Sequence, residues 1–348
     1  MSRIEKIQQK LIKTGVDLLV LREQGNIVYA VDWDKPLSGI LLIPKSGDAK
    51  LITSRLEGIK LPSSINGVKV IKTERGEKLL QRVLKEVDKG LKYVEFDSLD
   101  MNYVLELENE LNILIKTKSK IVSEMRKVKD QYEIEKLRKA AEIASLIARE
   151  VFEELEEGVS EVEVAYRYNY GVVLKGAFKP AFETIVAFGE NSYDPHFTPS
   201  SRRLKKGEIV LLDAGADYLN YKSDLTRTMV FKDNGGGNKV REMVEAVEEA
   251  KKAVEKIASP KVKASELDAV ACEVLAEYGF EEYFVHGLGH GVGIDIHEPP
   301  SIEPSSNEEL RAGNVITIEP GVYIPGVGGV RIEDTYLITD SGLVKLTF

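Results

Sequence analysis

The sequence predicts a two-domain protein, with an α/β domain at the N-terminus followed by an α+β domain that contains an internal pseudo-two-fold repeat. Strand and helix patterns alternate through residues 1–118, which is typical of a small α/β domain. After that the order is two helices and then strands, and this order occurs twice. A length of 348 residues also favours more than one domain.

The composition excludes several classes of function. The net charge is −9 and no basic run stands out, so we expect no nucleic-acid partner. The single cysteine, Cys272, excludes an intrachain disulfide and a Cys-type zinc site, and we interpret it as a small core residue. The charged start of the chain is unlike a signal peptide, and no apolar run reaches the roughly 20 residues that span a bilayer. We therefore expect a cytoplasmic protein with no membrane contact.

The first domain is predicted to cover residues 1–118 and to alternate between strands and helices. The expected elements are a helix over 2–14, strands over 17–21, 27–31, 39–43 and 50–53, a helix over 74–89, a strand over 92–96, a helix over 100–110 and a strand over 112–115. No Gly-rich phosphate-binding loop occurs among them. A polar, Lys-rich linker is expected over 119–130.

The second domain is predicted to cover residues 131–348. Its expected elements are helices over 130–156 and 160–174, strands over 182–188, 208–213 and 226–231, a glycine turn over 235–237, helices over 238–258 and 264–278, and strands and turns over 283–348. Ser160, with Glu163 three residues later, is a typical helix N-cap.

Two segments of the second domain carry the same pattern of carboxylates. An apolar strand ends on Asp213, with a glycine two residues later, and the chain then reaches Asp224, with a threonine two residues later. Glu319 and Glu333 repeat this order in the second segment. We interpret the two segments as a repeated hairpin that carries two acids.

These four acids indicate a metal centre. A carboxylate at the end of so apolar a strand is costly to bury unless its charge is compensated, although any one of them alone could mark where a strand reaches water. Two divalent cations would balance the four negative charges. Carboxylates with one or two imidazoles suit Mn²⁺, Co²⁺, Fe²⁺ or Zn²⁺. Two such ions can activate a water molecule and polarise a carbonyl group, which predicts metal-assisted hydrolysis.

The histidines cluster near this pattern. The chain has four, of which His286, His290 and His297 lie close together and His196 lies apart. The glycines around His290 disfavour a helix, so we place His286 and His290 on one face of a Gly-rich strand, where the missing side chains let a substrate approach. Each histidine alone could be structural. Together they indicate metal ligands, proton carriers or transition-state donors. A dinucleotide loop is disfavoured because no helix begins after these glycines.

The quoted residues and their surroundings resemble the metallopeptidase family of the pita-bread fold. Its members include methionine aminopeptidase, aminopeptidase P, Xaa-Pro dipeptidase (prolidase) and the metal-free enzyme creatinase. The resemblance covers residues 120–348 and is carried by DAGA, SDLTRT, HGLGHGVGIDIHEPP, EPGVY and GGVRIEDT. It implies a pita-bread catalytic domain over 131–348. Residues 1–118 resemble more loosely the α/β domain of the Xaa-Pro peptidases and creatinase, which argues against methionine aminopeptidase.

The resemblance implies a role for each matching residue. The implied metal ligands are Asp213, Asp224, His290, Glu319 and Glu333, with Asp224 and Glu333 between the two ions. Glu319 is also implied to move protons to and from the attacking water. The residues implied to orient the scissile carbonyl and stabilise the tetrahedral intermediate are His196, His286 and His297. Arg331 is expected to share a strand face with Glu333 and to support it, the alternative being a solvated strand arginine.

The implied enzyme is a homodimeric hydrolase that cleaves short peptides before proline with two divalent ions, Mn²⁺ or Co²⁺ first and otherwise Fe²⁺ or Zn²⁺. We expect an Xaa-Pro dipeptidase. Aminopeptidase P activity on longer peptides is the alternative. A non-catalytic peptide-binding member and a creatinase-like metal-free hydrolase are disfavoured by the complete ligand set. A dipeptidase must bind the free proline carboxylate, for which an arginine is expected where Ser301 stands. Trp33 is interpreted as a core anchor or as a wall of a partner subunit's site.

Overall fold

The computed structural model describes residues 1–348 except 89, 99–104, 106, 111–113 and 233–236. The chain forms two compact units, Met1–Arg126 and Lys127–Phe348, called here the N-terminal and the C-terminal unit. The stretch expected as a linker, 119–130, contains the helix α5 (Ile121–Lys127). Within the described ranges, no helix is both long enough and apolar enough to cross a membrane.

The N-terminal unit is a mixed sheet with helices, as its alternating pattern predicts. The strand order is β4-β5-β3-β2-β1-β6-β7, and the pairs β1–β6, β3–β5 and β6–β7 are parallel. The strands are β1 (Leu18–Leu21), β2 (Ile40–Pro44), β3 (Lys50–Thr53), β4 (Ser64–Ile65), β5 (Val68–Lys72), β6 (Tyr93–Phe96) and β7 (Leu114–Lys118). The helices are α1 (Arg3–Thr14), α2 (Gln24–Val31), α3 (Leu79–Glu86) and the 3₁₀ helix η1 (Glu57–Lys60).

The prediction of a strand over 27–31 is wrong, because this segment belongs to the helix α2. Every residue from Gly25 to Val31 is buried, so the segment shows an unbroken apolar run that fits a buried strand and a buried helix equally well. Asp97 fixes the start of this helix. Its carboxylate accepts hydrogen bonds from the backbone N–H groups of Arg22 and Glu23 and from the side chain of Asn26.

Other differences in the N-terminal unit concern boundaries. The helix expected over 74–89 is shorter, and β4 and β5 were not predicted. The helix predicted over 100–110 and the strand predicted over 112–115 lie partly outside the described residues, as does the glycine turn predicted over 235–237. In the part that is described, 107–110 are helical and β7 begins at Leu114.

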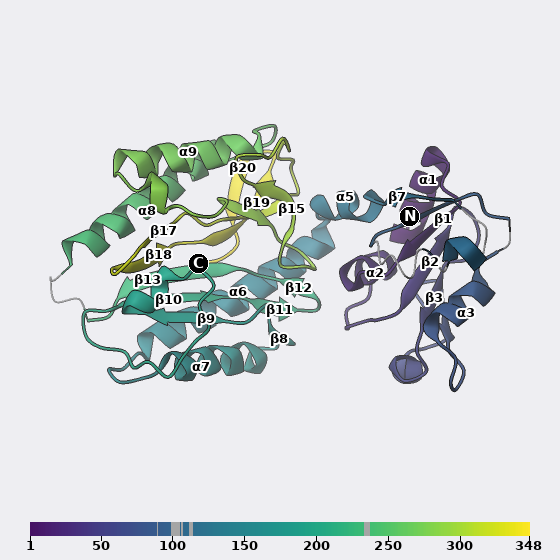
Figure 1. The fold of residues 1–348 in the computed structure, drawn as a ribbon, viewed down its shortest axis with the longest axis horizontal. Helices are drawn as coiled ribbons and strands as arrows, with labels where there is room; N and C mark the ends of the chain where they lie inside the picture. The colour runs from purple at the N-terminus through teal and green to yellow at the C-terminus, as the bar shows by residue number, and fades with distance from the viewer. Residues whose placement is uncertain (89, 99–104, 106, 111–113, 233–236) are drawn as a thin grey trace. The chain divides into compact units, whose positions relative to one another are not determined.

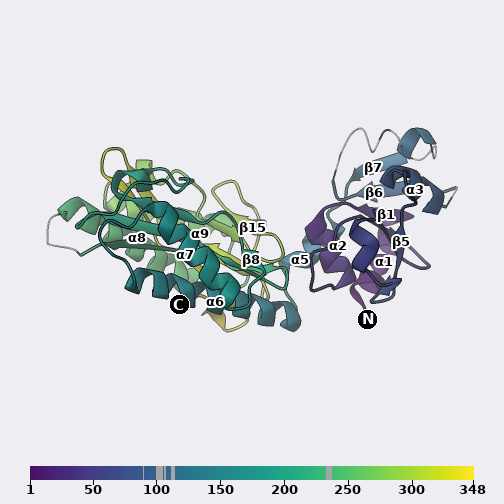
Figure 2. The same cartoon turned by 90° about the horizontal axis from the view of Figure 1, so that it is seen from below.

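The C-terminal unit places strands between two pairs of helices (Figure 1). The helices are α6 (Gln131–Glu153), α7 (Glu161–Leu174), α8 (Asn238–Ile257) and α9 (Ala264–Glu277). Figure 2 shows α6 and α7 together on one side of the strands. Both begin with a capping box, formed by Asp130 and Glu133 in α6 and by Ser160 and Glu163 in α7.

The strands that are described in the C-terminal unit form four sheets. The first half contributes β13-β10-β9 and β12-β11-β8, and the second half contributes β15-β14-β16-β19-β20 and β17-β18. The strands are β8 (Lys179–Pro180), β9 (Ile185–Phe188), β10 (Ile209–Ala214), β11 (Ala216–Tyr218), β12 (Tyr221–Lys222), β13 (Leu225–Val230), β14 (Gly289–Gly291), β15 (Glu298–Ile302), β16 (Val315–Ile318), β17 (Gly321–Ile324), β18 (Gly328–Arg331), β19 (Asp334–Thr339) and β20 (Gly342–Lys345). Two short 3₁₀ helices complete the unit, η2 (Gly189–Tyr193) and η3 (Glu281–Tyr283).

Each half of the C-terminal unit has its own apolar core. In the first half, α6 and α7 pack on β9 and β10 through side chains such as Tyr168 and Phe188. In the second half, α8 and α9 pack on β16 and β19 through side chains such as Leu267 and Ile316. Two helices on strands, formed twice, confirm the internal pseudo-two-fold repeat that the sequence predicts.

The two halves meet where the carboxylate hairpins run side by side. A bridge pairs Thr226 with Glu333, and the hydroxyl of Thr226 donates to Glu333 Oε2 at 2.7 Å. In the other direction, the hydroxyl of Thr335 donates to the backbone oxygen of Asp224 at 2.7 Å. The threonine that follows each second acid therefore binds the second acid of the opposite hairpin, which explains why both hairpins carry this residue.

The two hairpins are similar but not identical copies. Asp213 lies opposite Thr226 in the pair β10–β13, whereas Thr335 lies opposite Thr317, two residues before Glu319. The register thus differs by two residues between the halves. Because side chains alternate faces with a period of two, this shift keeps every acid on the inner face.

Candidate metal centre and active site

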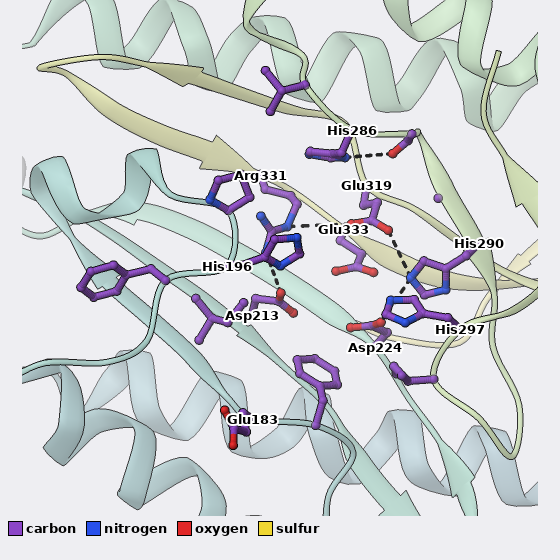
Figure 3. Close-up of a pocket in the computed structure, with 18 of the residues that line it drawn as sticks. Glu183, His196, Asp213, Asp224, His286, His290, His297, Glu319, Arg331 and Glu333 are labelled. Carbon is purple, nitrogen blue, oxygen red and sulfur yellow. Dashed lines mark hydrogen bonds and ion pairs between the residues drawn. The ribbon is translucent and has the colours of Figure 1, made fainter. Parts of the chain in front are cut away.

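A cavity of about 700 Å³ lies in the C-terminal unit, where the two carboxylate hairpins meet. Figure 3 shows the acids and histidines directed into one common space. All the residues proposed from the sequence line this cavity: His196, Asp213, Asp224, His286, His290, His297, Glu319, Arg331 and Glu333. The fold therefore brings together residues that are more than 130 positions apart in the chain.

The acids come from strand ends that lie next to one another. Asp213 lies in β10, Asp224 precedes β13, Glu319 follows β16 and Glu333 precedes β19. Three of them are almost completely buried, with Asp213 9%, Asp224 5% and Glu333 1% exposed. Burial of so many carboxylates in one place requires positive charge close by.

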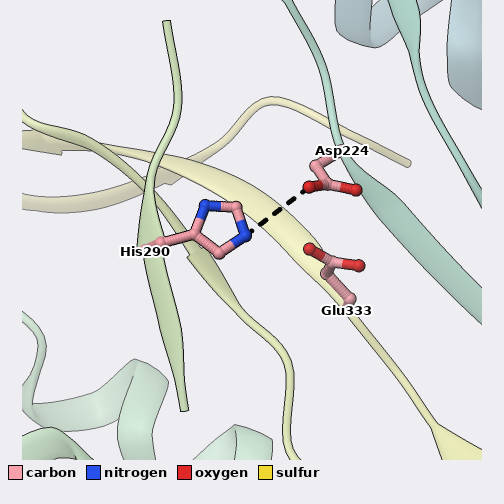
Figure 4. A group of neighbouring side chains, drawn as sticks. All are labelled: Asp224, His290 and Glu333. Carbon is pink, nitrogen blue, oxygen red and sulfur yellow. Dashed lines mark ion pairs between the residues drawn. The ribbon is translucent and has the colours of Figure 1, made fainter. Parts of the chain in front are cut away.

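Three side chains of this group are arranged as metal ligands would be. One nitrogen or oxygen atom each from Asp224, His290 and Glu333 lies within 4.8 Å of the others (Figure 4). His290 Nε2 is 3.6 Å from Asp224 Oδ2 and 3.3 Å from Glu319 Oε1. The other ring nitrogen, Nδ1, is 3.1 Å from the backbone oxygen of Gly291. When a cation is bound, the ring proton would lie on Nδ1 and leave Nε2 free as the ligand atom.

The pKa shifts of the acids and their unpaired oxygens also indicate that positive charge is needed in the cavity. Burial, followed by the charges of neighbouring carboxylates, raises the pKa of Asp224 and of Glu333 well above the ordinary range. Two buried carboxylate oxygens, Asp213 Oδ1 and Glu333 Oε1, have no hydrogen-bond partner. Unpaired oxygens of this kind are expected when their partner is a cation, so the residues fit a divalent metal centre.

Glu319 differs from the other acids because cations surround it. Burial alone would raise its pKa, but the hydrogen bond and charge of His290, with the charge of Arg331, lower the pKa of Glu319 to about 2. Its carboxylate also accepts a hydrogen bond from the hydroxyl of Thr317 at 3.2 Å. Glu319 is therefore ionised and can accept a proton from a water molecule in the cavity.

Arg331 contacts a different acid from the one expected. The sequence places it on a face with Glu333, but its Nη2 donates to Asp213 Oδ2 at 2.6 Å. It is 3% exposed, which excludes the alternative of a solvated strand arginine. Its other nitrogens donate to the hydroxyls of Tyr323 and Thr226 at 2.5 and 3.0 Å. The difference arises because β18 ends at Arg331, so the alternation that would align it with Glu333 is interrupted.

His286 is not on the Gly-rich strand, because β14 begins at Gly289. Its ring lies between two partners, with Nδ1 2.8 Å from the oxygen of Gly287 and Nε2 3.0 Å from the hydroxyl of Tyr323. Since Tyr323 receives a hydrogen bond from Arg331, it donates its own proton to Nε2, and Nδ1 donates to Gly287. Burial lowers the pKa of His286. The ring is thus neutral, and both of its nitrogens are engaged.

Tyr323 is a site residue that the sequence analysis missed. It lies on β17, is 2% exposed, and connects His286 to Arg331. Burial raises the pKa of its hydroxyl to about 12. Its position four residues after Glu319, in the motif EPGVY, was available in the sequence, but an aromatic residue in an apolar strand pattern gives no sign of a polar role.

His196 and His297 are exposed and have ring atoms available to a substrate. His297 stands directly before β15, and its ring packs edge-on against His290, with centroids 4.4 Å apart and an interplanar angle of 75°. Partial burial, followed by the charge of His290, lowers the pKa of His297. His196 follows η2, and its backbone N–H donates to Asp194 Oδ1.

The rest of the cavity wall consists mainly of apolar side chains, together with two further acids. The apolar lining residues include Phe182, Ile185, Pro195, Phe197, Pro199, Val285, Ile296 and Ile302. Glu183 and Glu303 also line the cavity, and Ser301 lies opposite His290 in the pair β14–β15. Among the described lining residues Arg331 is the one arginine or lysine, and Asp213 neutralises it.

The glycines of the motif HGLGHGVGIDIHEPP let neighbouring strands pack closely, and some of them also line the cavity. A Cβ atom at Gly289 would lie 2.4 Å from the oxygen of Thr317, and one at Gly291 would lie 2.5 Å from the oxygen of Pro299. These backbones therefore approach more closely than any side chain permits. Gly287 and Gly289 do line the cavity, as the sequence analysis expected for a surface that a substrate approaches.

Comparison with known proteins gives concordant results. The model of metallopeptidase family M24 matches residues 135–340. The chain is 37% identical to an Xaa-Pro dipeptidase of Pyrococcus horikoshii over 348 residues, which is 99% of this chain and 97% of that protein. The structure of the prolidase from Pyrococcus horikoshii OT3 superposes with a TM-score of 0.92 over 99% of this chain and 98% of the other. The X-Pro aminopeptidase of Thermotoga maritima, 29% identical, superposes with a TM-score of 0.86 over 98% and 97%.

Proposed function

Because the chain belongs to metallopeptidase family M24, a family of divalent-metal peptidases, we propose that it hydrolyses the peptide bond that precedes proline and acts as an Xaa-Pro dipeptidase. The observation that carries this proposal is the cavity itself, which gathers the four acids of the hairpins and four histidines beside an apolar wall. The similarity to the Xaa-Pro dipeptidase of Pyrococcus horikoshii extends over 99% of the chain and so includes both units.

The proposed metal ligands are Asp213, Asp224, His290, Glu319 and Glu333. When bound, two divalent ions supply Lewis acidity that activates water and polarises the scissile carbonyl. The unpaired oxygens of Asp213 and Glu333 support their assignment as ligands. Mn²⁺ or Co²⁺ is the proposed metal, with Fe²⁺ or Zn²⁺ as alternatives, because a set of carboxylates and one imidazole suits these ions.

In the proposed reaction, Glu319 accepts a proton from the attacking water and returns it to the proline nitrogen as the bond breaks. The low pKa of Glu319 means that the group is ionised before water arrives. His297 and His196 donate hydrogen bonds to the carbonyl oxygen as negative charge develops there. His286 shapes the cavity wall, since its ring nitrogens are occupied by Gly287 and Tyr323.

The apolar wall is the proposed binding surface for the proline ring. Phe182, Phe197 and Ile185 offer the flat and branched surfaces on which a pyrrolidine ring packs. The Xaa-Pro bond has no N–H group, so the site does not have to satisfy one. An apolar surface beside the acids suits this substrate.

The test of the proposal is hydrolysis of an Xaa-Pro dipeptide, such as Met-Pro or Leu-Pro, measured with and without a chelator. We expect hydrolysis that a chelator abolishes and that Mn²⁺ or Co²⁺ restores. Asp224→Asn should lose activity while remaining folded. An undiminished rate after exhaustive chelation, or a near wild-type rate in Asp224→Asn, would contradict the proposal.

A second activity, that of an Xaa-Pro aminopeptidase, is favoured by Ser301. This residue stands where an arginine was expected to bind the free carboxylate of a dipeptide. Arg331 is the one arginine or lysine among the described lining residues, and it is paired with Asp213. The two activities are distinguished by measuring hydrolysis of an Xaa-Pro dipeptide and of an Xaa-Pro-Yaa tripeptide under the same metal conditions. Cleavage of the dipeptide alone establishes the dipeptidase, and efficient cleavage of the tripeptide establishes the aminopeptidase.

We also propose that the chain is cytoplasmic and that it forms a homodimer. The feature that supports a homodimer is one face of α7. Four apolar or aromatic side chains at helical spacing are between 46% and 71% exposed there: Tyr166, Tyr170, Val173 and Leu174. The two tyrosines alone expose roughly 200–350 Å² of their side chains, and contiguous apolar patches of a few hundred Å² usually mark interaction sites. A second copy of the chain would cover this face. Sedimentation should detect a dimer, and Tyr166→Lys with Tyr170→Lys should weaken it; a monomeric wild type would contradict this.

A further inference from the structure

A buried ion pair lies behind the turn that carries His297. Lys129 Nζ is 3.1 Å from Glu298 Oε2, and the two side chains are 1% and 3% exposed. Lys129 lies two residues before α6, and Glu298 directly follows His297. Neither residue lines the cavity. A pair buried to this extent costs desolvation, which the attraction between the charges and their hydrogen bonds must offset.

The pair fixes the turn 293–298 through the carboxylate of Glu298, which packs against the backbone of the turn. The second oxygen of Glu298, Oε1, accepts the backbone N–H of Asp295 at 2.9 Å. The carboxylate lies directly beneath Gly293, where a Cβ atom would be 2.6 Å from both of its oxygens. Lys129 is itself anchored, because its backbone N–H donates to the oxygen of Gly313 at 2.8 Å.

A second lysine holds the other side of the same turn. The backbone N–H of Lys222 donates to the oxygen of Gly293 at 2.8 Å, and its ammonium group donates to the oxygen of Ile294. The turn is thus fixed on both sides, whereas the ring of His297 is exposed and packs edge-on against the ring of His290. The position of this ring therefore depends on the backbone of the turn.

We propose that Lys129 and Glu298 are positioning residues that hold His297 over the cavity, so that its ring meets the scissile carbonyl of the substrate. This inference rests on the proposed function, because it assigns the purpose of the ion pair to the hydrolytic step. It predicts that loss of the pair acts on the rate of the reaction through His297, and leaves the proposed metal ligands, which lie outside this turn, in place.

The test uses the full-length protein and three variants: Lys129→Met/Glu298→Met, His297→Ala and the combination of both. Methionine fills a similar volume without charge, so the first variant avoids an unpaired buried charge. We expect its kcat on an Xaa-Pro dipeptide to fall roughly ten- to hundredfold, as for a displaced positioning group, with KM and Mn²⁺ affinity little changed. In the His297→Ala background the same double substitution should change kcat by less than about twofold.

Two further variants guard against a general loss of stability. Lys129→Arg keeps the charge and should retain most of the wild-type kcat. If the methionine variant does not fold, Lys129→Gln/Glu298→Gln replaces it, because glutamine is polar and uncharged and the double substitution leaves no unpaired buried charge. The control is Arg82→Met/Glu86→Met, which removes a 2.8 Å ion pair in the N-terminal unit and should leave kcat unchanged.

A spectroscopic measurement makes the inference independent of activity. The chain has four histidines, so histidine-selective ¹⁵N labelling gives a small set of ring signals. Removal of the pair should shift or broaden the signal that His297→Ala identifies and leave that of His196 in place. Wild-type kcat and an unmoved His297 signal in the pair variants would overturn the inference. The inference would also be overturned if the reductions in kcat caused by the methionine pair and by His297→Ala multiplied in the combined variant, because the two changes would then act independently. A wild-type protein without Xaa-Pro hydrolysis would count against the proposed function, and the ring signals would still decide this inference.

Discussion

Arg331 donates a 2.6 Å hydrogen bond from Nη2 to Asp213 Oδ2, deep between the two hairpins. Asp213 thus has one oxygen held by a guanidinium group and one oxygen without a hydrogen-bond partner. This arrangement fixes the plane of the carboxylate and directs the second oxygen towards the cavity. Burial raises the pKa of Asp213, and the charge of Arg331 opposes that rise.

Arg331→Gln should therefore reduce both metal affinity and activity. Glutamine is uncharged and cannot reach Asp213, Tyr323 and Thr226 together, so the ligand loses its orientation. We expect kcat/KM and Mn²⁺ affinity to fall about 10- to 100-fold, as when the partner of a metal ligand is removed. Calorimetric titration with Mn²⁺ measures the affinity. Arg203→Gln, at a side chain that is 69% exposed, is the control, and equal effects of both substitutions would contradict this role.

Gly289→Ala should displace β14 and destabilise the C-terminal unit. The added methyl group would lie 2.4 Å from a backbone oxygen of β16, which cannot move aside as a flexible side chain can. We expect a loss of about 1–3 kcal/mol in the free energy of unfolding and a marked loss of activity. Thermal unfolding measures the first. Gly237→Ala, where the nearest atom would be 4.0 Å away, should have little effect.

Ser301→Arg should favour dipeptides over longer peptides. Ser301 lines the cavity opposite His290, so an arginine there can reach the carboxylate of a terminal proline. We expect the KM for an Xaa-Pro dipeptide to fall severalfold and that for an Xaa-Pro-Yaa tripeptide to stay the same or rise. Ser305→Arg, at a nearby exposed serine that is not among the described lining residues, is the control. An unchanged ratio of the two KM values would show that this position does not select the substrate.

Asp17 should stabilise the N-terminal unit above pH 4 and lose this effect below it. The side-chain bond from Lys45, with backbone bonds from Lys92 and Tyr93, lowers the pKa of Asp17 to about 2 from an ordinary value of 3.8. A folded-state pKa below the unfolded one stabilises the fold at higher pH, and the stabilisation is lost as the pH falls through the folded value. Asp17→Asn should cost about 1 kcal/mol at pH 6, after allowance for solvent screening.

The pH dependence of this difference is the measurement that checks the sign. Between pH 4 and pH 2 the wild type should lose its advantage over Asp17→Asn, because Asp17 itself becomes protonated. Denaturant unfolding at each pH gives both values. A difference that grows as the pH falls would contradict the assignment.

Much of the C-terminal unit could be predicted from the sequence, because its signals are local or repeated. The caps at Asp130 and Ser160 mark where α6 and α7 begin, and the paired acids mark the hairpins. In contrast, α2 was mistaken for a strand because complete burial removes the alternation that distinguishes the two structures.

The site residues proposed from the sequence all line the cavity, but several of their contacts could not be predicted. Arg331 binds Asp213, 118 positions away in the chain, and Tyr323 joins it to His286. Lys129 and Glu298 are separated by 169 positions. No sequence period connects such pairs, since they depend on how the two halves of the unit pack together.

The most direct test of the central claim is the number of divalent ions that each chain binds and needs. Metal-free protein, titrated with Mn²⁺, should bind two ions per chain by elemental analysis, and hydrolysis of an Xaa-Pro dipeptide should appear only as these ions bind. Asp224→Asn should fail to retain the pair of ions. Full activity in protein that contains no divalent metal, or two ions retained without Asp224, would contradict the claim that these hairpins form the catalytic metal centre.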